Sequence, residues 1–371
     1  MTMKARAAVL TEQPGKWHIE EVDLDPPKDF EVLVEFAATG LCHSDDHMAK
    51  GDIPCSHLPY NGGHEGAGVV LDVGPGVRLV KPGDHIVTSF IPSCGRCRWC
   101  ASGMQNLCDL GGVMGMGALL DGTYRKHLNG VDIAQSAFAG TFSSHTVMPE
   151  WGCIKIPEHI PLQAAALLGC GVPTGWGSAV YAAETKPGDV IIVVGVGGIG
   201  MSAVQGAAHA GATRVIAVDP VAFKRDMSTL FGATDAFATM EEATDLARSL
   251  TNGQGADATI LAVGVLTSAD VATAVDSIRK GGTVVMTAVA RADAMGIPVN
   301  LVQFAMFQKR IQGVLFGMMS PAKDVPRLLS MYERGQLKLD EMVTRTYTLD
   351  EINQGYDDLH AGTNLRGVVL F

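Results

Sequence analysis

The pattern of hydrophobic and polar residues changes near residue 174. Before that point, short runs of strand-forming residues at 31–38, 67–74 and 85–90 are separated by turn segments such as Val-Gly-Pro-Gly. Short strands with turn residues between them predict an irregular, mostly antiparallel, barrel-like domain.

After residue 189, apolar runs alternate with segments of helical periodicity. The apolar runs are at 190–194, 214–218, 258–263 and 283–288. Helices are predicted between them, at 198–210, 222–231, 241–250 and 268–279. Because the runs lack polar alternation, they indicate a parallel sheet covered by helices on both faces. The C-terminal segment departs from this pattern and predicts helices at 321–335 and 350–360 and a strand at 366–371.

Composition and charge narrow the class of protein. The chain has 371 residues, which favours two domains of an α/β protein. Its formal net charge is −11 and 47% of its residues are hydrophobic, so disorder, a nucleic-acid partner and an anionic membrane surface are not expected. Two uncharged stretches, 159–183 and 190–213, are interrupted by glycine or proline and are interpreted as buried protein structure rather than membrane spans. The N-terminus shows no secretory signal, so a reducing, cytoplasmic location is expected.

A glycine-rich turn follows the first strand of the second domain. Residues 193–200 are VVGVGGIG, and Asp219 ends the next predicted strand. Gly195 allows a tight turn, Gly197 lets the backbone approach a pyrophosphate, and Gly200 allows close packing of the helix. The turn predicts a dinucleotide site in which Asp219 binds ribose hydroxyls and favours NAD over NADP. A glycine-rich turn without a ligand is the alternative.

Four of the eight cysteines, Cys94, Cys97, Cys100 and Cys108, lie in one short segment. Four thiolates suit a tetrahedral zinc with no open position, which is a structural site. Two alternatives are a pair of disulfides, disfavoured in a reducing compartment, and a zinc ribbon that contacts nucleic acid, disfavoured by the acidic charge.

Cys42, His64 and Cys170 are far apart along the chain, and each alone is more typical of a packed residue than of a ligand. Together they form a set of two cysteines and one histidine. Three protein ligands with an open fourth position are typical of a catalytic zinc. Cys55 and Cys153 match no ligand position and are interpreted as packing or surface thiols.

Four features in order resemble one family. They are Gly-His-Glu at 63–65, the four-cysteine segment, Gly-Cys-Gly-Val-Pro-Thr-Gly at 169–175 and the glycine-rich turn. Over essentially its full length the chain resembles the zinc-dependent medium-chain alcohol dehydrogenases. Within that family it is most similar to the nicotinoprotein, or nitrosodimethylaniline-dependent, branch, on the basis of segments 89–94, 121–125 and 219–225.

The resemblance implies a domain organisation and a zinc site. The expected domains are a GroES-like catalytic domain at 1–173 with a structural zinc lobe at 94–108, a Rossmann NAD-binding domain at 174–318, and a return to the catalytic domain at 319–371. Cys42, His64 and Cys170 are implied as ligands of the catalytic zinc. Glu65 is implied as an occasional ligand and Asp45 as the residue that orients His64.

The resemblance also implies contacts with substrate and cofactor. Ser44 and His47 match the family's proton relay, and Phe90 and Phe142 match positions that line an apolar substrate cleft. The implied contacts with NAD are His43 and Arg366 at the pyrophosphate, Lys224 and Asp219 at the adenosine ribose, Thr174 and Ile199 at the nicotinamide, and the turn residues Gly195, Gly197, Gly198 and Gly200. Many relatives have arginine where this chain has His43, and histidine supplies fewer donors.

The expected activity is interconversion of an alcohol, expected to be primary and apolar, and its aldehyde by hydride transfer to tightly bound NAD, with an external electron acceptor. An ordinary dehydrogenase with exchanging NAD and a catalytically silent binding protein on the same fold are the alternatives. The apolar region at 304–311 and 314–319 predicts a homo-oligomer, because relatives join their cofactor domains there.

Overall fold

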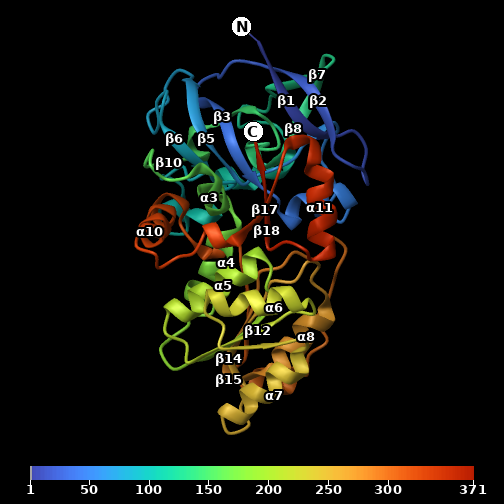
Figure 1. Cartoon of the computed structure of the whole chain (residues 1–371), viewed down its shortest axis with the longest axis vertical. Coiled ribbons are helices and arrows are strands. Elements are labelled where there is room, and N and C mark those ends of the chain that lie inside the picture. The colour runs from blue at the N-terminus through green and yellow to red at the C-terminus, as the bar shows by residue number, and fades with distance from the viewer. Residues whose placement is uncertain (1) are drawn as a thin grey trace. The chain divides into compact units, whose positions relative to one another are not determined.

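The computed structural model describes residues 2–371, which form two compact units (Figure 1). The first unit contains the chain up to Cys170 together with Ser320–Phe371, and the second contains Gly171–Met319. The sequence predicted these boundaries at 173/174 and 318/319, within a few residues of the boundaries between the two units.

The first unit contains a small closed barrel and a larger sheet. The barrel has the strand order β1-β2-β7-β8-β4. Its strands are β1 (Met3–Leu10), β2 (His18–Leu24), β7 (Lys126–Leu128), β8 (Val131–Gln135) and β4 (Tyr60–Asn61). In β1 successive side chains point to opposite faces, and both faces are buried: Ala7 and Val9 pack in one cluster, Ala8 and Leu10 in another.

The larger sheet has the order β10-β6-β5-β3-β18-β17, and β9 also pairs with β3. Its strands are β10 (Cys153–Ile156), β6 (His85–Thr88), β5 (Gly66–Val73), β3 (Glu31–Gly40), β18 (Arg366–Leu370), β17 (Val343–Tyr347) and β9 (His145–Pro149). The last strand of the chain, β18, pairs antiparallel with β3, with Val369 opposite Thr39. The C-terminal segment therefore completes a sheet that the N-terminal residues begin.

The helices of the first unit are short, apart from two near the C-terminus. They are α1 (His43–Lys50), α2 (Arg98–Ala101), α3 (Leu162–Ala166), α10 (Pro321–Glu333) and α11 (Ile352–Ala361). Single 3₁₀ turns lie at Gln105–Leu107, Ser136–Phe138, Glu150–Gly152, Leu167–Gly169, Asp340–Met342 and Leu349–Glu351, and a longer one at Asp109–Met116.

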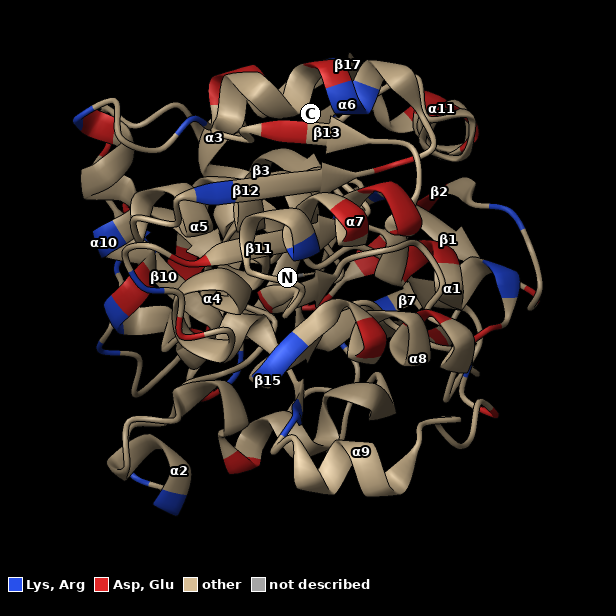
Figure 2. Ribbon diagram, turned by 90° about the horizontal axis from the view of Figure 1, so that it is seen from below, with Lys and Arg blue, Asp and Glu red and all other residues tan. Residues whose placement is uncertain are grey.

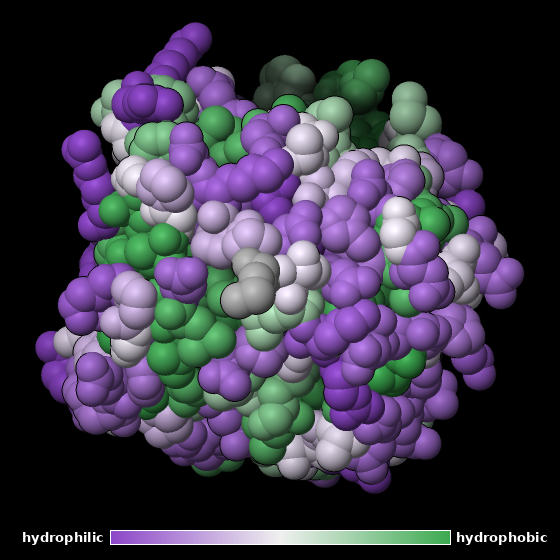
Figure 3. Space-filling view, turned by 90° about the horizontal axis from the view of Figure 1, so that it is seen from above, coloured by the Kyte–Doolittle hydropathy of each residue, from purple (hydrophilic) through white to green (hydrophobic). Residues whose placement is uncertain are grey.

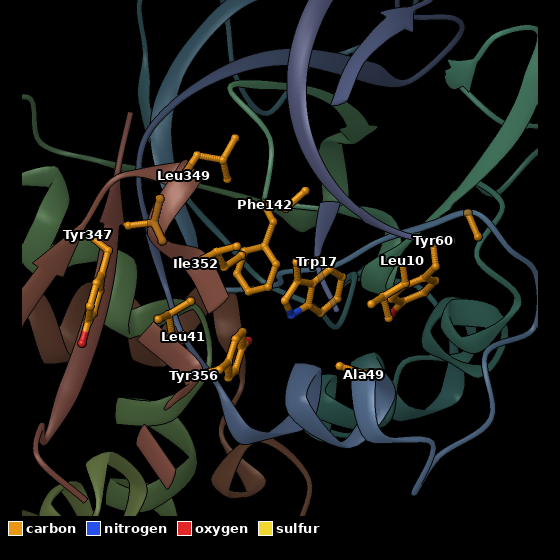
Figure 4. Packing of buried hydrophobic residues seen from close by; sticks show 13 residues of the cluster. Leu10, Trp17, Leu41, Ala49, Tyr60, Phe142, Tyr347, Leu349, Ile352 and Tyr356 are labelled. Carbon is orange, nitrogen blue, oxygen red and sulfur yellow. The ribbon is translucent and has the colours of Figure 1, made fainter. Parts of the chain in front are cut away.

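An aromatic cluster joins distant segments of this unit (Figure 4). Trp17 meets Phe142 edge-on, with ring centroids 5.4 Å apart, and stacks on Tyr356 at 6.4 Å.

The face of the molecule seen in Figure 3 carries both hydrophobic and hydrophilic residues. Such a mixture is ordinary for the surface of a folded protein.

The second unit contains a six-stranded parallel sheet of order β13-β12-β11-β14-β15-β16. The strands are β11 (Val190–Val194), β12 (Arg214–Val218), β13 (Asp235–Phe237), β14 (Ala256–Leu261), β15 (Ile278–Met286) and β16 (Arg310–Gly313). The helices are α4 (Gly171–Gly177), α5 (Gly198–His209), α6 (Ala222–Ser228), α7 (Met240–Leu250), α8 (Ser268–Ser277) and α9 (Leu301–Met306), with a π turn at Ser178–Ala182 and 3₁₀ turns at Thr229–Phe231 and Phe316–Met318. This strand order is that of a Rossmann domain, which confirms the predicted fold class.

The predicted helix at 268–279 ends earlier than expected, because Ile278 has extended backbone and begins β15. The uncharged stretch at 190–213 is a strand, a turn and a helix, as the sequence indicated. Across residues 2–371, no helix is both long enough and apolar enough to span a membrane.

Candidate active site

Four potential metal ligands from three segments of the first unit meet in its interior. One ligand atom from each of Cys42, His64, Glu65 and Cys170 lies within 4.8 Å of the others, and all four residues are buried. Cys42 precedes α1, His64 and Glu65 precede β5, and Cys170 follows a 3₁₀ turn. The structure thus brings together residues from three segments that lie far apart along the chain.

His64 is held by Asp45. Its Nδ1 lies 3.1 Å from Asp45 Oδ2, and Asp45 Oδ1 accepts a hydrogen bond from the Gly63 amide at 2.8 Å. A carboxylate on Nδ1 fixes the ring and makes its other nitrogen the natural metal ligand.

The charges around this cluster suit a cation. The hydrogen bond with Cys170, together with the positive charges of His64 and Arg366, lowers the pKa of Cys42 well below its usual value, despite burial. Burial alone would lower the pKa of His64, but the negative charges of Asp45 and Cys42 more than offset it and raise that pKa well above its usual value. The cluster therefore stabilises an anionic sulfur and attracts positive charge, as a zinc site of two cysteines and one histidine requires.

Glu65 forms a buried ion pair with Arg366 of β18. Neither side chain is appreciably exposed, at 0% for Glu65 and 6% for Arg366. The sequence assigned Arg366 to a pyrophosphate and Glu65 to occasional metal ligation. Both roles stay predictions, and in this structure each group is the other's partner.

The expected relay residues both lie on α1. Ser44 Oγ accepts from Cys42 Sγ at 3.6 Å, which places this hydroxyl beside the metal ligands. His47 is almost completely buried, and its Nδ1 lies 2.9 Å from Asp52 Oδ2. His43, the first residue of the helix, is partly exposed.

The two phenylalanines expected to line a substrate cleft have different environments. Phe90 is partly exposed and packs edge-on against His64, with ring centroids 5.6 Å apart, so it lies next to the metal ligands. Phe142 has no exposed surface and packs with Trp17 and Tyr356 in the aromatic cluster (Figure 4). An apolar residue of this kind suits both the core and a cleft, and its role in a substrate cleft stays a prediction.

Cys94, Cys97, Cys100 and Cys108 also have their sulfur atoms within 4.8 Å of one another. The sulfur atoms of Cys94 and Cys100, and those of Cys97 and Cys108, are 4.0 Å apart, far beyond the ~2.05 Å of a disulfide bond. The amide of Cys100 donates to the Cys97 sulfur and lowers the pKa of that thiol to about 6, whereas burial raises the pKa of Cys100 to about 12. Four free sulfurs with amide donors fit a closed tetrahedral zinc site.

The glycine-rich turn of the second unit has the features of a dinucleotide site. Gly195 has φ of +81°, and a Cβ at Gly200 would lie 1.9 Å from the Gly195 carbonyl oxygen, so neither position accepts a side chain without strain. A Cβ at Gly197, by contrast, would meet nothing within 4 Å. The turn therefore leaves open space at the N-terminus of α5, which is where a phosphate binds. Gly198 is the first residue of that helix.

Among the other expected cofactor residues of this unit, Asp219 and Ile199 lie at the turn. Both carboxylate oxygens of Asp219 accept backbone hydrogen bonds, one from Val196 at 3.0 Å and one from Val221 at 2.9 Å. Lys224 is half-buried and lies on α6. Gly175 of α4 packs against the backbone carbonyl of Ile199 in α5. Thr174 precedes Gly175, so the packing of α4 on α5 brings Thr174 and Ile199 into the same region.

Comparison with known proteins identifies the family. Residues 28–158 match the model of the alcohol dehydrogenase GroES-like domain, and residues 198–334 match the zinc-binding dehydrogenase model. The NDMA-dependent alcohol dehydrogenase of Amycolatopsis methanolica is 48% identical over 368 residues, 99% of each chain. The chain belongs to the zinc-dependent medium-chain alcohol dehydrogenases.

Solved structures agree with this assignment. An alcohol dehydrogenase zinc-binding domain protein from Burkholderia ambifaria is 31% identical and superimposes with a TM-score of 0.93 over 100% of both chains. Benzyl alcohol dehydrogenase from Acinetobacter calcoaceticus is 27% identical, with a TM-score of 0.91 over 100% of this chain and 99% of that one.

Two residues beside the site of this alcohol dehydrogenase were missed by sequence reasoning. The Tyr356 hydroxyl donates to the Cys42 carbonyl at 3.3 Å, and no spacing marks it, because α11 is more than three hundred residues away along the chain. Asp52 had a local signal: it follows Gly51, a glycine that ends the helix carrying His47.

Proposed function

We propose that this alcohol dehydrogenase interconverts an apolar primary alcohol and its aldehyde at a zinc held by Cys42, His64 and Cys170, with NAD that stays bound between turnovers. The observation that carries the reaction type is the buried ligand cluster whose histidine is oriented by Asp45. The retained cofactor is supported by the 48% identity with an NDMA-dependent relative.

When bound, the zinc supplies a Lewis acid that makes the alcohol hydroxyl acidic, and NAD supplies the hydride acceptor. The chain's own residues handle the proton: the Ser44 hydroxyl passes it on, and His47 carries it towards solvent. Oxidation of one alcohol thus yields one aldehyde, one hydride transferred and one proton released. If the nucleotide does not leave, a second substrate or an external acceptor has to take the hydride back before the next alcohol is oxidised. Phe90 beside His64 gives the substrate an apolar neighbour.

The remaining site residues take the cofactor roles that the sequence predicts. In this proposal Gly195, Gly197, Gly198 and Gly200 admit the pyrophosphate, with His43 and Arg366 as cationic contacts. Asp219 and Lys224 bind the adenosine ribose, and Thr174 and Ile199 lie beside the nicotinamide. A second zinc, in the four-cysteine lobe, is structural, so each chain holds two.

One experiment separates retained from exchanging NAD. The protein is purified without added nucleotide and denatured, and the supernatant is assayed for NAD(H). We expect close to one nucleotide per chain, and turnover of alcohol with an artificial acceptor in the absence of added NAD. Nucleotide-free protein that turns over only with added NAD would instead support an ordinary dehydrogenase. Protein that binds zinc but oxidises no alcohol under either condition would support a silent binding protein.

We also propose a homo-oligomer formed through the second unit. Strand β16 is the last strand of its sheet in the described part of the chain, and α9 before it has the uncharged sequence LVQFAM (Figure 2). Leu301, Val302 and Met306 are 75%, 71% and 74% exposed, which is unusual for a group of neighbouring apolar residues. A free strand edge beside an apolar helix favours pairing with a second copy.

A further inference from the structure

The side chain of Gln13 binds the last turn of α1 at one point and the loop that follows α1 at two. Its Nε2 donates to the carbonyls of Met48 and Ile53, the second at 2.8 Å, and its Oε1 accepts from the Cys55 amide at 2.8 Å. The opposite orientation of the amide would set oxygen against two carbonyls, so one orientation satisfies all three bonds. Gln13 therefore fixes the backbone on both sides of residue 52.

The loop held by Gln13 returns Asp52 to the helix. Gly51 has φ of +81°, which reverses the chain at the end of α1, and the Asp52 amide then donates to the His47 carbonyl at 2.9 Å. The Asp52 carboxylate reaches the same residue from the side, with Oδ2 2.9 Å from His47 Nδ1. The side chains of His47 and Asp52 are 2% and 14% exposed, so water competes little for this contact.

We propose that Asp52 and Gln13 are positioning residues for the proton relay, with Asp52 orienting the His47 imidazole and Gln13 holding Asp52 in place. The inference rests on the relay role of His47 in the proposed function. A carboxylate on Nδ1 keeps a proton on that nitrogen and leaves Nε2 as the atom that takes a proton from the Ser44 side and releases one towards solvent. No proton moves to Asp52, and the Nδ1–H bond is kept throughout.

The test compares variants in two backgrounds, wild type and His47→Gln, with the zinc-loaded enzyme and an alcohol as substrate. Asp52→Ala should lower kcat about 10-fold while the KM for alcohol stays within about twofold, because the imidazole loses its orientation and the substrate site is not touched. Asp52→Asn should lower kcat less, since its amide oxygen still accepts from Nδ1. Gln13→Met, which removes three hydrogen bonds at similar volume, should lower kcat by about 3-fold.

In the His47→Gln background none of these substitutions should lower kcat further, because residues that act through one group are not additive. Equal losses in both backgrounds would overturn the inference. An unchanged kcat in the His47→Gln single variant would show that His47 is not a relay residue, which contradicts both the proposed relay and the inference. This variant therefore distinguishes a failure of the proposed function from a failure of the inference alone.

Asn353→Leu is the matched control for Gln13→Met. The Asn353 amide also holds N-terminal backbone, accepting from Trp17 N at 3.1 Å and donating to Trp17 O at 2.8 Å, but it does not bind the loop after α1. The kcat of Asn353→Leu should equal that of wild type. A loss of kcat as large as that of Gln13→Met would show a general effect of loosening the N-terminal segment and would contradict the inference. Zinc content and the unfolding midpoint are measured for every variant. If Gln13→Met does not fold, the two Asp52 variants still decide the result.

Discussion

At the scale of single residues, two glycines of the first unit pack directly against the buried ion pair of Glu65 and Arg366. A Cβ at Gly40 would come within 2.8 Å of the Arg366 guanidinium and still closer to the Glu65 carboxylate. A Cβ at Gly169, directly before Cys170, would lie 3.0 Å from the Glu65 Cα. Because two glycines pack so closely around Glu65 and Arg366, this ion pair has little freedom to separate without movement of the surrounding backbone.

Cys170→Ala tests whether the buried ligand cluster holds a metal. We expect the zinc content to fall from two per chain to one and alcohol turnover to fall by more than about 100-fold, because the metal would lose one of its three protein ligands. Cys153→Ala is the control, since Cys153 is also a buried cysteine but is in neither ligand group. Metal analysis of both variants gives the answer, and a Cys170→Ala protein that keeps two zinc ions would contradict the proposed site.

At the scale of elements, the turn between β11 and α5 separates packing from ligand binding. Gly200 contacts the backbone of the turn itself, whereas the space beside Gly197 is open. Both glycines belong to one motif, but a methyl group at each position should therefore have a different effect.

Gly197→Ala should change stability by no more than about 0.5 kcal/mol, because its φ of −72° suits alanine and its Cβ meets no atom. The same methyl group should reduce the nucleotide content of the purified protein, since it occupies the space for the pyrophosphate. Gly200→Ala should destabilise the second unit by about 1–3 kcal/mol, because the helix has to move away from the turn. Thermal unfolding and nucleotide assays measure both. Equal stability losses in the two variants would show that Gly197 is also a packing position.

Elements buried on both faces were the best predicted from sequence. The expected strands 190–194 and 214–218 match β11 and β12 to the residue, because each is a mostly apolar run bounded by residues typical of turns. The two clusters of potential metal ligands were predicted because cysteine and histidine are rare enough for their spacing to carry information, although spacing alone did not join Cys170 to His64. Tyr356 was missed, because aromatic residues are common both in protein cores and at functional sites, and sequence alone does not separate the two uses.

At the scale of the whole molecule, the proposed homo-oligomer would cover the exposed apolar side chains of α9 and the edge strand β16. Val302→Asp together with Met306→Asp should convert an oligomer to a smaller species, because both side chains are more than 70% exposed in the single chain and would be buried between copies. Leu79→Asp is the control, since Leu79 is an apolar residue of the first unit that is 54% exposed. Light scattering after size-exclusion chromatography reports the mass. An unchanged mass in the double variant would place the interface elsewhere.

The pairing of β18 with β3 has a consequence for how the protein is made. Arg366, the partner of Glu65, lies in the last strand, and that strand docks beside one that the ribosome produced more than three hundred residues earlier. The second unit lies wholly between them in the chain and can fold while synthesis continues. The buried carboxylate of Glu65 therefore lacks its counter-charge until β18 has been synthesised. A chain that stops before β18 would leave this edge of β3 unpaired, and an unpaired strand edge is prone to aggregate.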